Sequence, residues 1–108
     1  MHAQFTFFDG PATPEQLAAD DFAGRERILP AVRELGHWFR LYRMQRPDGS
    51  RVYVTIAETE QALLDGQKAI MSTELLADED PALLPGPDRV ELYPVLDVVD
   101  INQAPASA

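Results

Sequence analysis

Four side chains on two neighbouring predicted strands have the types needed to bind and polarise a planar acidic molecule. Trp38, Arg40 and Tyr42 alternate along one segment, and Tyr53 lies on the next. Alternate positions of a strand share one face of a sheet, so this pattern places aromatic rings beside a guanidinium. Arg40 could then stabilise a phenolate or enolate, while Tyr42 or Tyr53 donates a hydrogen bond to a carbonyl. The alternative is a protein interface, because dimer contacts favour aromatic and arginine side chains.

A histidine and two further residues extend this candidate site. His37 starts the first of these strands, where an imidazole that titrates near pH 6.5 could accept a proton from a phenol. The alternative is a partly exposed histidine without a chemical role. The candidate catalytic residues are therefore Arg40, Tyr53 and His37, and the candidate substrate-binding residues are Trp38, Tyr42, Thr55 and Phe22. Burial in the core is the simpler interpretation for the phenylalanines, namely Phe5, Phe7, Phe22 and Phe39.

The remaining residue types give other chemistries little support. The chain has no cysteine, which excludes a disulfide framework, a thiolate nucleophile and a thiolate metal site. Its two histidines, His2 and His37, and its acidic residues show no recognisable metal-ligand spacing. Lys68 is the single lysine, and there is no glycine-rich phosphate loop. We therefore predict no metal and no other cofactor.

Composition restricts the partners as well. The 108 residues fit one domain, and a formal charge of −9 repels phosphate backbones and anionic membranes. No apolar run is long enough to span a bilayer, and the first ten residues lack the features of a signal peptide. These observations predict a cytoplasmic protein that binds neither nucleic acid nor membrane. The acidic run at 78–80 is interpreted as a solvated loop rather than a metal site.

The first third of the chain is predicted to form a strand and then a helix. Aromatic alternation predicts the strand over 3–8. The segment Thr13-Pro14-Glu15-Gln16 has the pattern of a helix start with a capping box. Pro30 interrupts the helical apolar spacing, which predicts a kink over 26–30. Gly36 then suits the left-handed residue that closes a helix.

A hairpin follows, and its register decides which side chains meet. Segments 37–45 and 51–57 are predicted strands around Arg46-Pro47-Asp48-Gly49-Ser50, a type I turn signal. A four-residue loop pairs Arg46 with Arg51. In that register Tyr53 and Thr55 share a face with Trp38, Arg40, Tyr42 and Met44. A three-residue loop would shift the pairing by one position.

The last third of the chain is predicted to form a second helix and a final strand. Thr59 caps the helix, whose inner side carries Ala62, Leu63, Gly66, Ala69 and Ile70 and extends toward Leu75 and Leu76. An irregular segment leads to a strand at 89–93, which Pro94 ends. A further extended apolar stretch follows at 95–101. The domain is expected to span 1–101, with 102–108 as a flexible tail.

This order of elements predicts an α+β domain of the ferredoxin-like βαββαβ type. Such a domain has a four-stranded antiparallel sheet with two helices on one face. The other face would be uncovered, yet both faces carry bulky side chains, and the stretch at 95–101 has no partner within the domain. A second copy would cover this surface, so we predict a homodimer packed sheet against sheet.

Two segments resemble a known family. The run RVYVTIAETEQALLDGQKAI at 51–70 and the closing PGPDRVELYPV at 85–95 are similar to the antibiotic biosynthesis monooxygenase family of the dimeric α+β barrel superfamily. The resemblance covers about residues 1–101 and implies a pocket between helices and sheet. Such families oxygenate phenols, quinols or haem without a conventional flavin or metal cofactor. The superfamily also includes isomerases, cyclases and proteins without known activity.

Two positions depart from the pattern of that family. A tryptophan usually ends the third strand in the haem-degrading branch and in several quinol monooxygenases, and a histidine follows on the second helix in the haem branch. Ala57 and Gln67 stand at these places here. Haem breakdown is not expected, because Gln67 is a poor iron ligand.

Three functions fit these observations, and the third is a purely structural or stress-associated dimer that shows neither ligand binding nor turnover. The first is a cofactor-independent monooxygenase or related isomerase acting on a small aromatic or polyketide-like molecule. The second is a non-catalytic homodimer that binds a small molecule or acts as an accessory protein. The resemblance favours the first, and the missing tryptophan and histidine favour the second.

Overall fold

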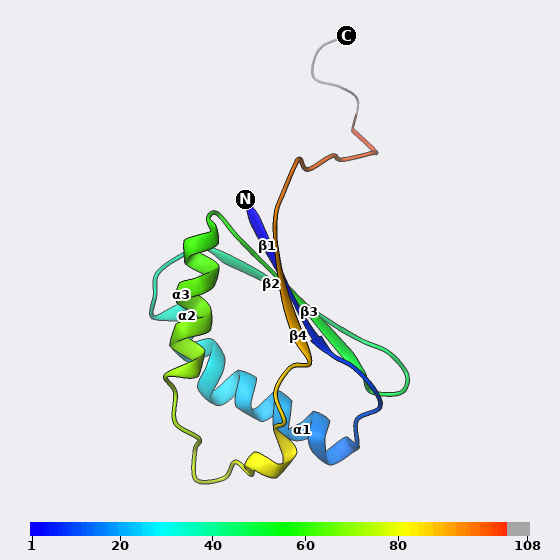
Figure 1. The fold of residues 1–108 in the computed structure, drawn as a ribbon, viewed down its shortest axis with the longest axis vertical. Helices are drawn as coiled ribbons and strands as arrows, with labels where there is room; N and C mark the ends of the chain where they lie inside the picture. Colours follow the sequence, from blue (N-terminus) through cyan, green and yellow to red (C-terminus); the bar gives the residue numbers. More distant parts are fainter. Residues whose placement is uncertain (104–108) are drawn as a thin grey trace.

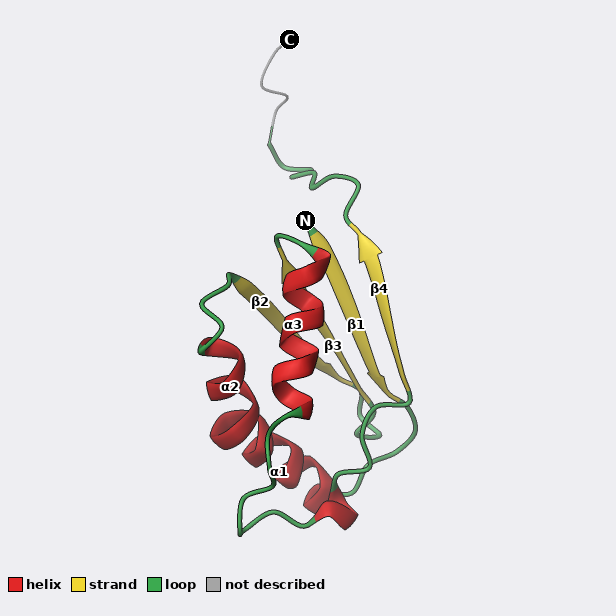
Figure 2. Cartoon of the chain, turned by 60° about the vertical axis from the view of Figure 1, so that its left-hand side comes forward, coloured by secondary structure: helices red, strands yellow, loops and turns green. Residues whose placement is uncertain are grey.

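The computed structural model describes residues 1–103 and confirms the ferredoxin-like α+β fold. Strands β1 (His2–Phe8), β2 (Phe39–Gln45), β3 (Arg51–Ala57) and β4 (Arg89–Pro94) form one antiparallel sheet in the order β2-β3-β1-β4. Helices α1 (Pro14–Ala23), α2 (Leu29–Arg33) and α3 (Glu60–Met71) lie on one side of this sheet (Figures 1 and 2). Residues 104–108, which belong to the predicted tail, lie outside the described part of the chain.

Side-chain caps start both main helices, as the sequence predicts. Thr13 Oγ1 accepts from the Gln16 N–H at 3.2 Å, and the Gln16 side chain accepts from the Thr13 N–H at 2.9 Å. This reciprocal pair is a complete capping box. Thr59 Oγ1 accepts from the Ala62 N–H at 3.1 Å and caps α3. The local polar chemistry of the chain therefore fixes where these helices begin.

The predicted kink is a short π-helix, η1 (Gly24–Ile28), which joins α1 to α2. Pro30 has no N–H to donate, and its ring would clash with the carbonyl four residues earlier in a regular α-helix. A wider turn with bonds between residues five apart relieves this conflict. The Leu29 N–H donates to the Gly24 carbonyl in this pattern.

The predicted extension of α3 toward Leu75 and Leu76 is wrong. The helix ends at Met71, because the hydroxyls of Ser72 and Thr73 donate to the carbonyls of Lys68 and Ile70 and so satisfy the last turn. Leu75 and Leu76 lie in an exposed loop. Between this loop and β4 the chain makes one 3₁₀ turn, η2 (Pro81–Leu83).

The hairpin has the three-residue loop rather than the four-residue loop. Gln45 pairs with Arg51, and the Arg46 N–H donates to the Ser50 carbonyl at 2.9 Å. The loop tip is therefore Pro47-Asp48-Gly49, with Gly49 at φ 92°, a conformation that glycine adopts without strain. In this register each β2 residue lies one position away from its predicted partner on β3. The β2 side chains that share a face with Tyr53 are therefore the ones that were predicted for the opposite face.

The shift separates the side chains that were predicted to act together. Tyr53 and Thr55 face the helices, opposite Arg43 and Leu41 of β2. Arg40 and Tyr42 instead point to the side of the sheet that no described element covers. We call this surface the open face; its large apolar members are Phe5, Phe7, Trp38, Tyr42, Met44, Val52, Val54, Ile56 and Tyr93.

The described protomer has a small core on the helix side. Its buried apolar residues are Ala23, Ala57, Ala62 and Leu63, and Phe39 and Leu92 pack partly against the last three. Ala3 is also buried, but it pairs with Ile56 and Tyr93 and so lies on the other side of the sheet. The core prediction is wrong for Phe5 and Phe7, because these rings lie on the open face. There Phe5 contacts Tyr93 edge-on, and the Arg89 guanidinium lies 3.8 Å from the centre of the Phe7 ring. Two large aromatic side chains therefore contribute to a surface instead of to the interior.

Candidate functional site

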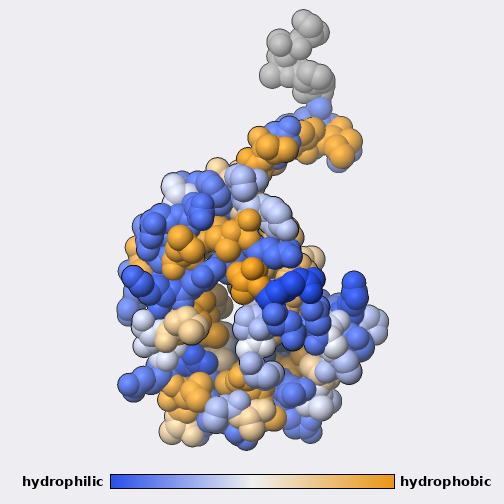
Figure 3. All heavy atoms as spheres, viewed as in Figure 1, coloured by the Kyte–Doolittle hydropathy of each residue, from blue (hydrophilic) through white to orange (hydrophobic). Residues whose placement is uncertain are grey.

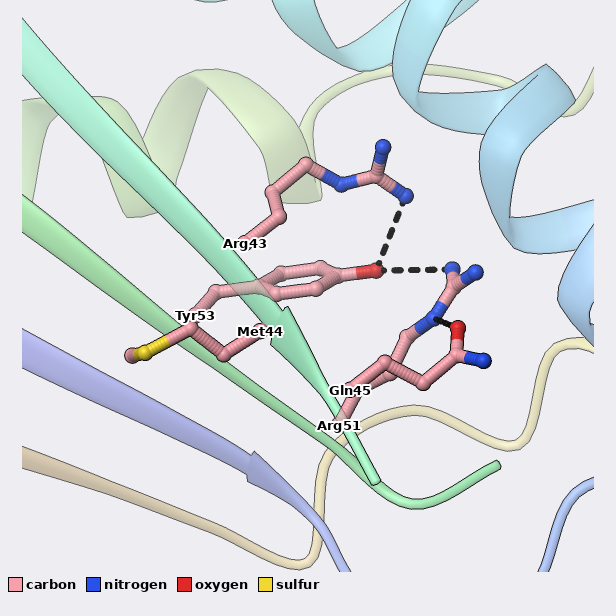
Figure 4. A pocket seen from close by; sticks show the side chains of 5 residues that line it. All are labelled: Arg43, Met44, Gln45, Arg51 and Tyr53. Atoms are coloured by element: carbon pink, nitrogen blue, oxygen red, sulfur yellow. Dashed lines mark hydrogen bonds between the residues drawn. The ribbon is translucent and has the colours of Figure 1, made fainter. Parts of the chain in front are cut away.

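The most connected polar site lies between α1 and the hairpin and centres on Tyr53. The Tyr53 hydroxyl donates to Asp20 Oδ2 and accepts from the guanidinium groups of Arg51 at 3.1 Å and Arg43 at 3.3 Å. Figure 4 shows both arginines pointing at the tyrosine hydroxyl. Arg51 also bonds to the carboxylates of Asp20 at 2.7 Å and Asp21 at 2.8 Å, and Arg43 bonds to Asp21. We call these five residues the Tyr53 cluster.

The Tyr53 cluster bridges a gap between a helix and the sheet. α3 packs directly on β1 and β3, whereas α1 reaches the sheet through the long side chains of Arg43 and Arg51. A hollow of about 140 Å³ lies beside the cluster on the hairpin, and it is lined by residues of β2 and β3, namely Arg43, Met44, Gln45, Arg51 and Tyr53 (Figure 4). Leu41, two residues away on the same side of β2, remains 38% exposed although it faces the helices.

The protonation states in this cluster follow from its contacts. Burial, reinforced by the hydrogen bond to the Asp20 carboxylate, raises the pKa of Tyr53. The hydrogen bond from Arg51, with a second from Arg43, lowers the pKa of Asp21. At neutral pH Tyr53 is thus a neutral hydrogen-bond donor, and the two guanidinium charges are matched by two carboxylates. The Tyr53 proton is donated to Asp20, so the guanidinium N–H groups of Arg43 and Arg51 are the donors that the cluster can offer to a ligand oxygen.

The predicted catalytic residues do not come together. Arg40 lies on the open face with its guanidinium 5.9 Å from the ring centre of Trp38, on the opposite side of the sheet from Tyr53. His37 precedes β2, and its Nε2 lies 3.6 Å from Asp65 Oδ2 of α3. This carboxylate was not predicted. The clamp of Arg40, Tyr42 and Tyr53 around one ligand therefore cannot form within a protomer.

The predicted substrate-binding residues are also divided between two surfaces. Trp38 and Tyr42 are about half exposed on the open face. Thr55 and Tyr53 share one face of β3, as predicted. That face is the helix side, where Thr55 lies opposite Leu41 of β2. Phe22 lies on α1, half-buried, with the Arg25 guanidinium 5.8 Å from its ring centre.

A second polar contact lies between α3 and β1. Gln67 Nε2 donates to Gln4 Oε1 at 2.6 Å, and the Gln4 amide donates to Thr6 Oγ1 at 3.4 Å. Gln67 thus satisfies the side chain of a strand residue by a hydrogen bond from α3. The departure noted in the sequence has a structural role here.

The residues of the Tyr53 cluster other than Tyr53 were missed in the sequence. A three-residue loop places Arg43 opposite Tyr53 by strand pairing alone, so the loop alternative was the signal for this residue. Asp20 and Asp21 give no such signal, because the position of α1 over the strands is set by tertiary packing.

Comparison with known proteins leaves the family open. No model of a known protein family matches the chain, and no curated protein matches it. Within residues 1–103, no group of three or more histidine, aspartate or glutamate side chains is arranged to hold a metal ion. None of the helices in that same part of the chain has the length and apolarity to cross a bilayer.

Proposed function

We propose that this chain is a homodimer of the dimeric α+β barrel type that binds a small planar aromatic molecule beside the Tyr53 cluster. The observation that carries the binding site is the hollow of about 140 Å³ at which two guanidinium groups and a tyrosine hydroxyl converge. A cavity of about 150 Å³ holds one benzene ring. Polar donors around a space of this size select a phenol, a quinol or an aromatic carboxylate.

The homodimer is supported by the open face. Its nine large apolar side chains lie on neighbouring strands of one sheet face, and monomeric proteins rarely expose apolar patches of more than a few hundred Å². Trp38, Tyr42 and Tyr93, which dominate many interfaces, are each 46–50% exposed. A second open face, packed at about 10 Å in the manner of stacked sheets, supplies the complementary surface.

The binding proposal is tested by titrating hydroquinone, catechol and benzoate into the protein while backbone amide signals are followed by NMR. We expect shifts at β2 and β3 around residues 43–45 and 51–53. Tyr53→Phe should weaken the affinity about fivefold, because the hydroxyl accepts from both guanidinium groups and holds them at the hollow, and one such hydrogen bond is worth roughly 1 kcal/mol. Tyr42→Phe, which removes the same atom from the open face, should bind like the original chain. Binding of none of these compounds, or equal loss in both variants, would exclude this site.

Cofactor-independent oxygenation or isomerisation is the second candidate function. The observation that favours it is the convergence of two arginines on Tyr53, because these cations stabilise a substrate that binds already ionised as a phenolate. Arg40 is not part of this arrangement. Oxygen uptake with quinols and anthrones should then fall in Tyr53→Phe and stay unchanged in Arg40→Ala. If oxygen uptake with the original chain and with both variants equals the rate in buffer alone, the chain does not turn these compounds over and binding is its remaining function.

A further inference from the structure

Asp21 of α1 places one carboxylate oxygen between two arginines of the sheet. Its Oδ1 atom accepts from Arg51 Nη1 at 2.8 Å and also from Arg43 Nη2. Within residues 1–103, Asp20 and Asp21 are the only carboxylates that pair with more than one arginine. We call Arg43 and Arg51 the two-arginine site. The protein itself shows that a carboxylate binds there.

Asp20 and Asp21 are held to different degrees. Asp20 Oδ2 accepts from the Tyr53 hydroxyl and from Arg51 Nη1 at 2.7 Å, and the Asp20 side chain is 26% exposed. The Asp21 side chain is 44% exposed, and that of Arg43 is 43% exposed. Ion pairs this exposed shift an equilibrium by about fivefold at most, because water competes for both charges. Asp21 can therefore turn out to solvent while Asp20 still joins α1 to the sheet.

The two-arginine site is also accessible from the hairpin. Arg43 and Arg51 line the hollow of about 140 Å³, and both guanidinium groups point toward the Tyr53 hydroxyl (Figure 4). All the residues that line this hollow belong to β2 and β3, whereas Asp21 reaches the arginines from α1. A ligand oxygen in the hollow therefore meets the same guanidinium groups that Asp21 binds.

Charge decides which ligand takes the place of Asp21. The two guanidinium groups are already matched by two carboxylates, so a bound anion would add a third negative charge unless one carboxylate leaves. A ligand carboxylate that displaces Asp21 keeps the balance. It can also place one oxygen on each guanidinium, whereas Asp21 uses Oδ1 for both. A phenol, which ionises only near about pH 10, would leave one arginine charge unmatched at neutral pH.

The rest of the surface offers an anion few alternatives. Acidic residues outnumber basic ones by 18 to 9, and the formal charge is −9. Figure 3 shows a face of the molecule on which hydrophilic side chains surround smaller apolar patches. On a protein that repels anions overall, two arginines that one ligand can reach together are a selective place for a carboxylate.

We propose that Asp21 is a built-in occupant of the two-arginine site, and that the ligand of the hollow is an aromatic carboxylate that displaces Asp21 when it binds. This proposal rests on the binding site proposed above and names the class of its ligand. It makes Asp21 a specificity-determining residue, because a carboxylate replaces its charge and a neutral aromatic molecule does not.

Calorimetric titration of benzoate, benzamide and catechol at pH 7 tests this competition. Asp21→Ala removes the competing carboxylate and should tighten the affinity for benzoate about fivefold, the most that an exposed ion pair changes an equilibrium. Asp21→Asn keeps the shape of the side chain without its charge and should also bind benzoate more tightly. Benzamide and catechol are neutral at this pH, so they should bind the variants and the original chain alike.

Glu15→Ala is the matched control. Glu15 lies on the same helix, is exposed, and takes part in no ion pair within residues 1–103. Its removal changes the net charge by the same amount as Asp21→Ala without touching either arginine. At physiological ionic strength distant exposed charges are screened, so this variant should bind benzoate like the original chain.

The outcomes separate the ligand class from the binding site itself. Tighter binding of benzoate to both Asp21 variants, but not to Glu15→Ala, supports the displacement. Benzoate that binds the Asp21 variants no more tightly than the original chain overturns it and leaves the binding site standing. An equal gain in Glu15→Ala, an equal gain for catechol, or binding of catechol without benzoate also overturns the carboxylate class alone. Binding of none of the three compounds to any of the proteins overturns both proposals.

The carboxyl carbon signals of Asp20 and Asp21 give an independent readout by NMR. Benzoate should move the Asp21 signal of the original chain toward that of a solvent-exposed aspartate, because its hydrogen bonds to two arginines are lost. The Asp20 signal should change little, because Asp20 keeps its bonds to Tyr53 and Arg51. A shift of the Asp20 signal with the Asp21 signal unchanged would contradict the displacement of Asp21.

Discussion

Tyr53 occupies the position where helix and sheet are joined by side chains rather than by packing. Its hydroxyl satisfies Asp20 and accepts from two arginines, so Tyr53→Phe leaves a half-buried carboxylate with one fewer donor. We expect the free energy of unfolding to fall by about 1–3 kcal/mol. Urea unfolding followed by circular dichroism measures this loss. Tyr42→Phe is the matched control, because Tyr42 lies on the open face, and an equal loss in both would contradict the role of the cluster.

Glu79 makes a second residue-level contact whose strength depends on pH. Its Oε2 accepts from Arg27 Nε at 2.7 Å and from the Leu76 N–H at 2.8 Å, and the bond from Arg27 lowers the pKa of Glu79 below its ordinary 4.5. A carboxyl with a lowered folded pKa stabilises the fold above its unfolded pKa. This contribution is lost as the pH falls from about 4.5 through the lower folded value.

Glu79→Gln should therefore be less stable than the original chain at pH 7, and the difference should shrink below about pH 4.5. Urea unfolding at a series of pH values from 3 to 7 measures this convergence. Asp78→Asn, one residue away and exposed, should follow the original curve. A difference between Glu79→Gln and the original that stays constant with pH would show that the ion pair to Arg27 contributes nothing.

At the scale of elements, two glycines are needed for different reasons. One is needed for its backbone conformation alone, and the other also for the space around its Cα atom. Gly49 and Gly86 both have positive φ, 92° and 84°. A Cβ on Gly49 would lie 2.8 Å from the Ala12 carbonyl oxygen, whereas a Cβ on Gly86 would meet nothing within 4 Å. Gly86→Ala should cost about 1–2 kcal/mol from backbone strain alone.

Gly49→Ala should cost more, because the hairpin tip must also move away from the segment before α1. The Ala12 N–H donates to the Asp48 carbonyl at 3.1 Å, and this contact would be disturbed as well. Thermal unfolding of the two variants side by side measures the difference. Equal midpoint temperatures for the two variants would show that the hairpin loop moves away from the added methyl group of Gly49→Ala at no cost in stability.

At the scale of the whole molecule, the open face determines the behaviour in solution. Val54→Asp places a charge at the centre of this face without touching the helix side. We expect the proposed dimer to dissociate to a 12.0 kDa monomer in light scattering, because an interface core excludes unpaired charge. Leu64→Asp, at a 40% exposed position on α3, is the control and should stay dimeric. A Val54→Asp protein that remains a folded dimer would place the interface elsewhere.

The sequence by itself determined those features that depend on neighbours along the chain. The capping box at Thr13, the cap at Thr59 and the disturbance before Pro30 are local, because each rests on bonds within a few residues. Side-chain alternation and turn residues likewise predicted the four strands, and the order of the elements predicted the uncovered sheet face. These features together were sufficient for the fold class.

Only the tertiary structure decided which side chains meet. One residue of loop length in the hairpin moved Tyr53 away from Arg40 and set it beside Arg43, because strand alternation turns a single-position shift into a change of face. The carboxylates of Asp20 and Asp21 reached the same hydroxyl through the placement of α1, which no local pattern encodes. Element order is a property of neighbours in sequence, whereas a site is a property of neighbours in space.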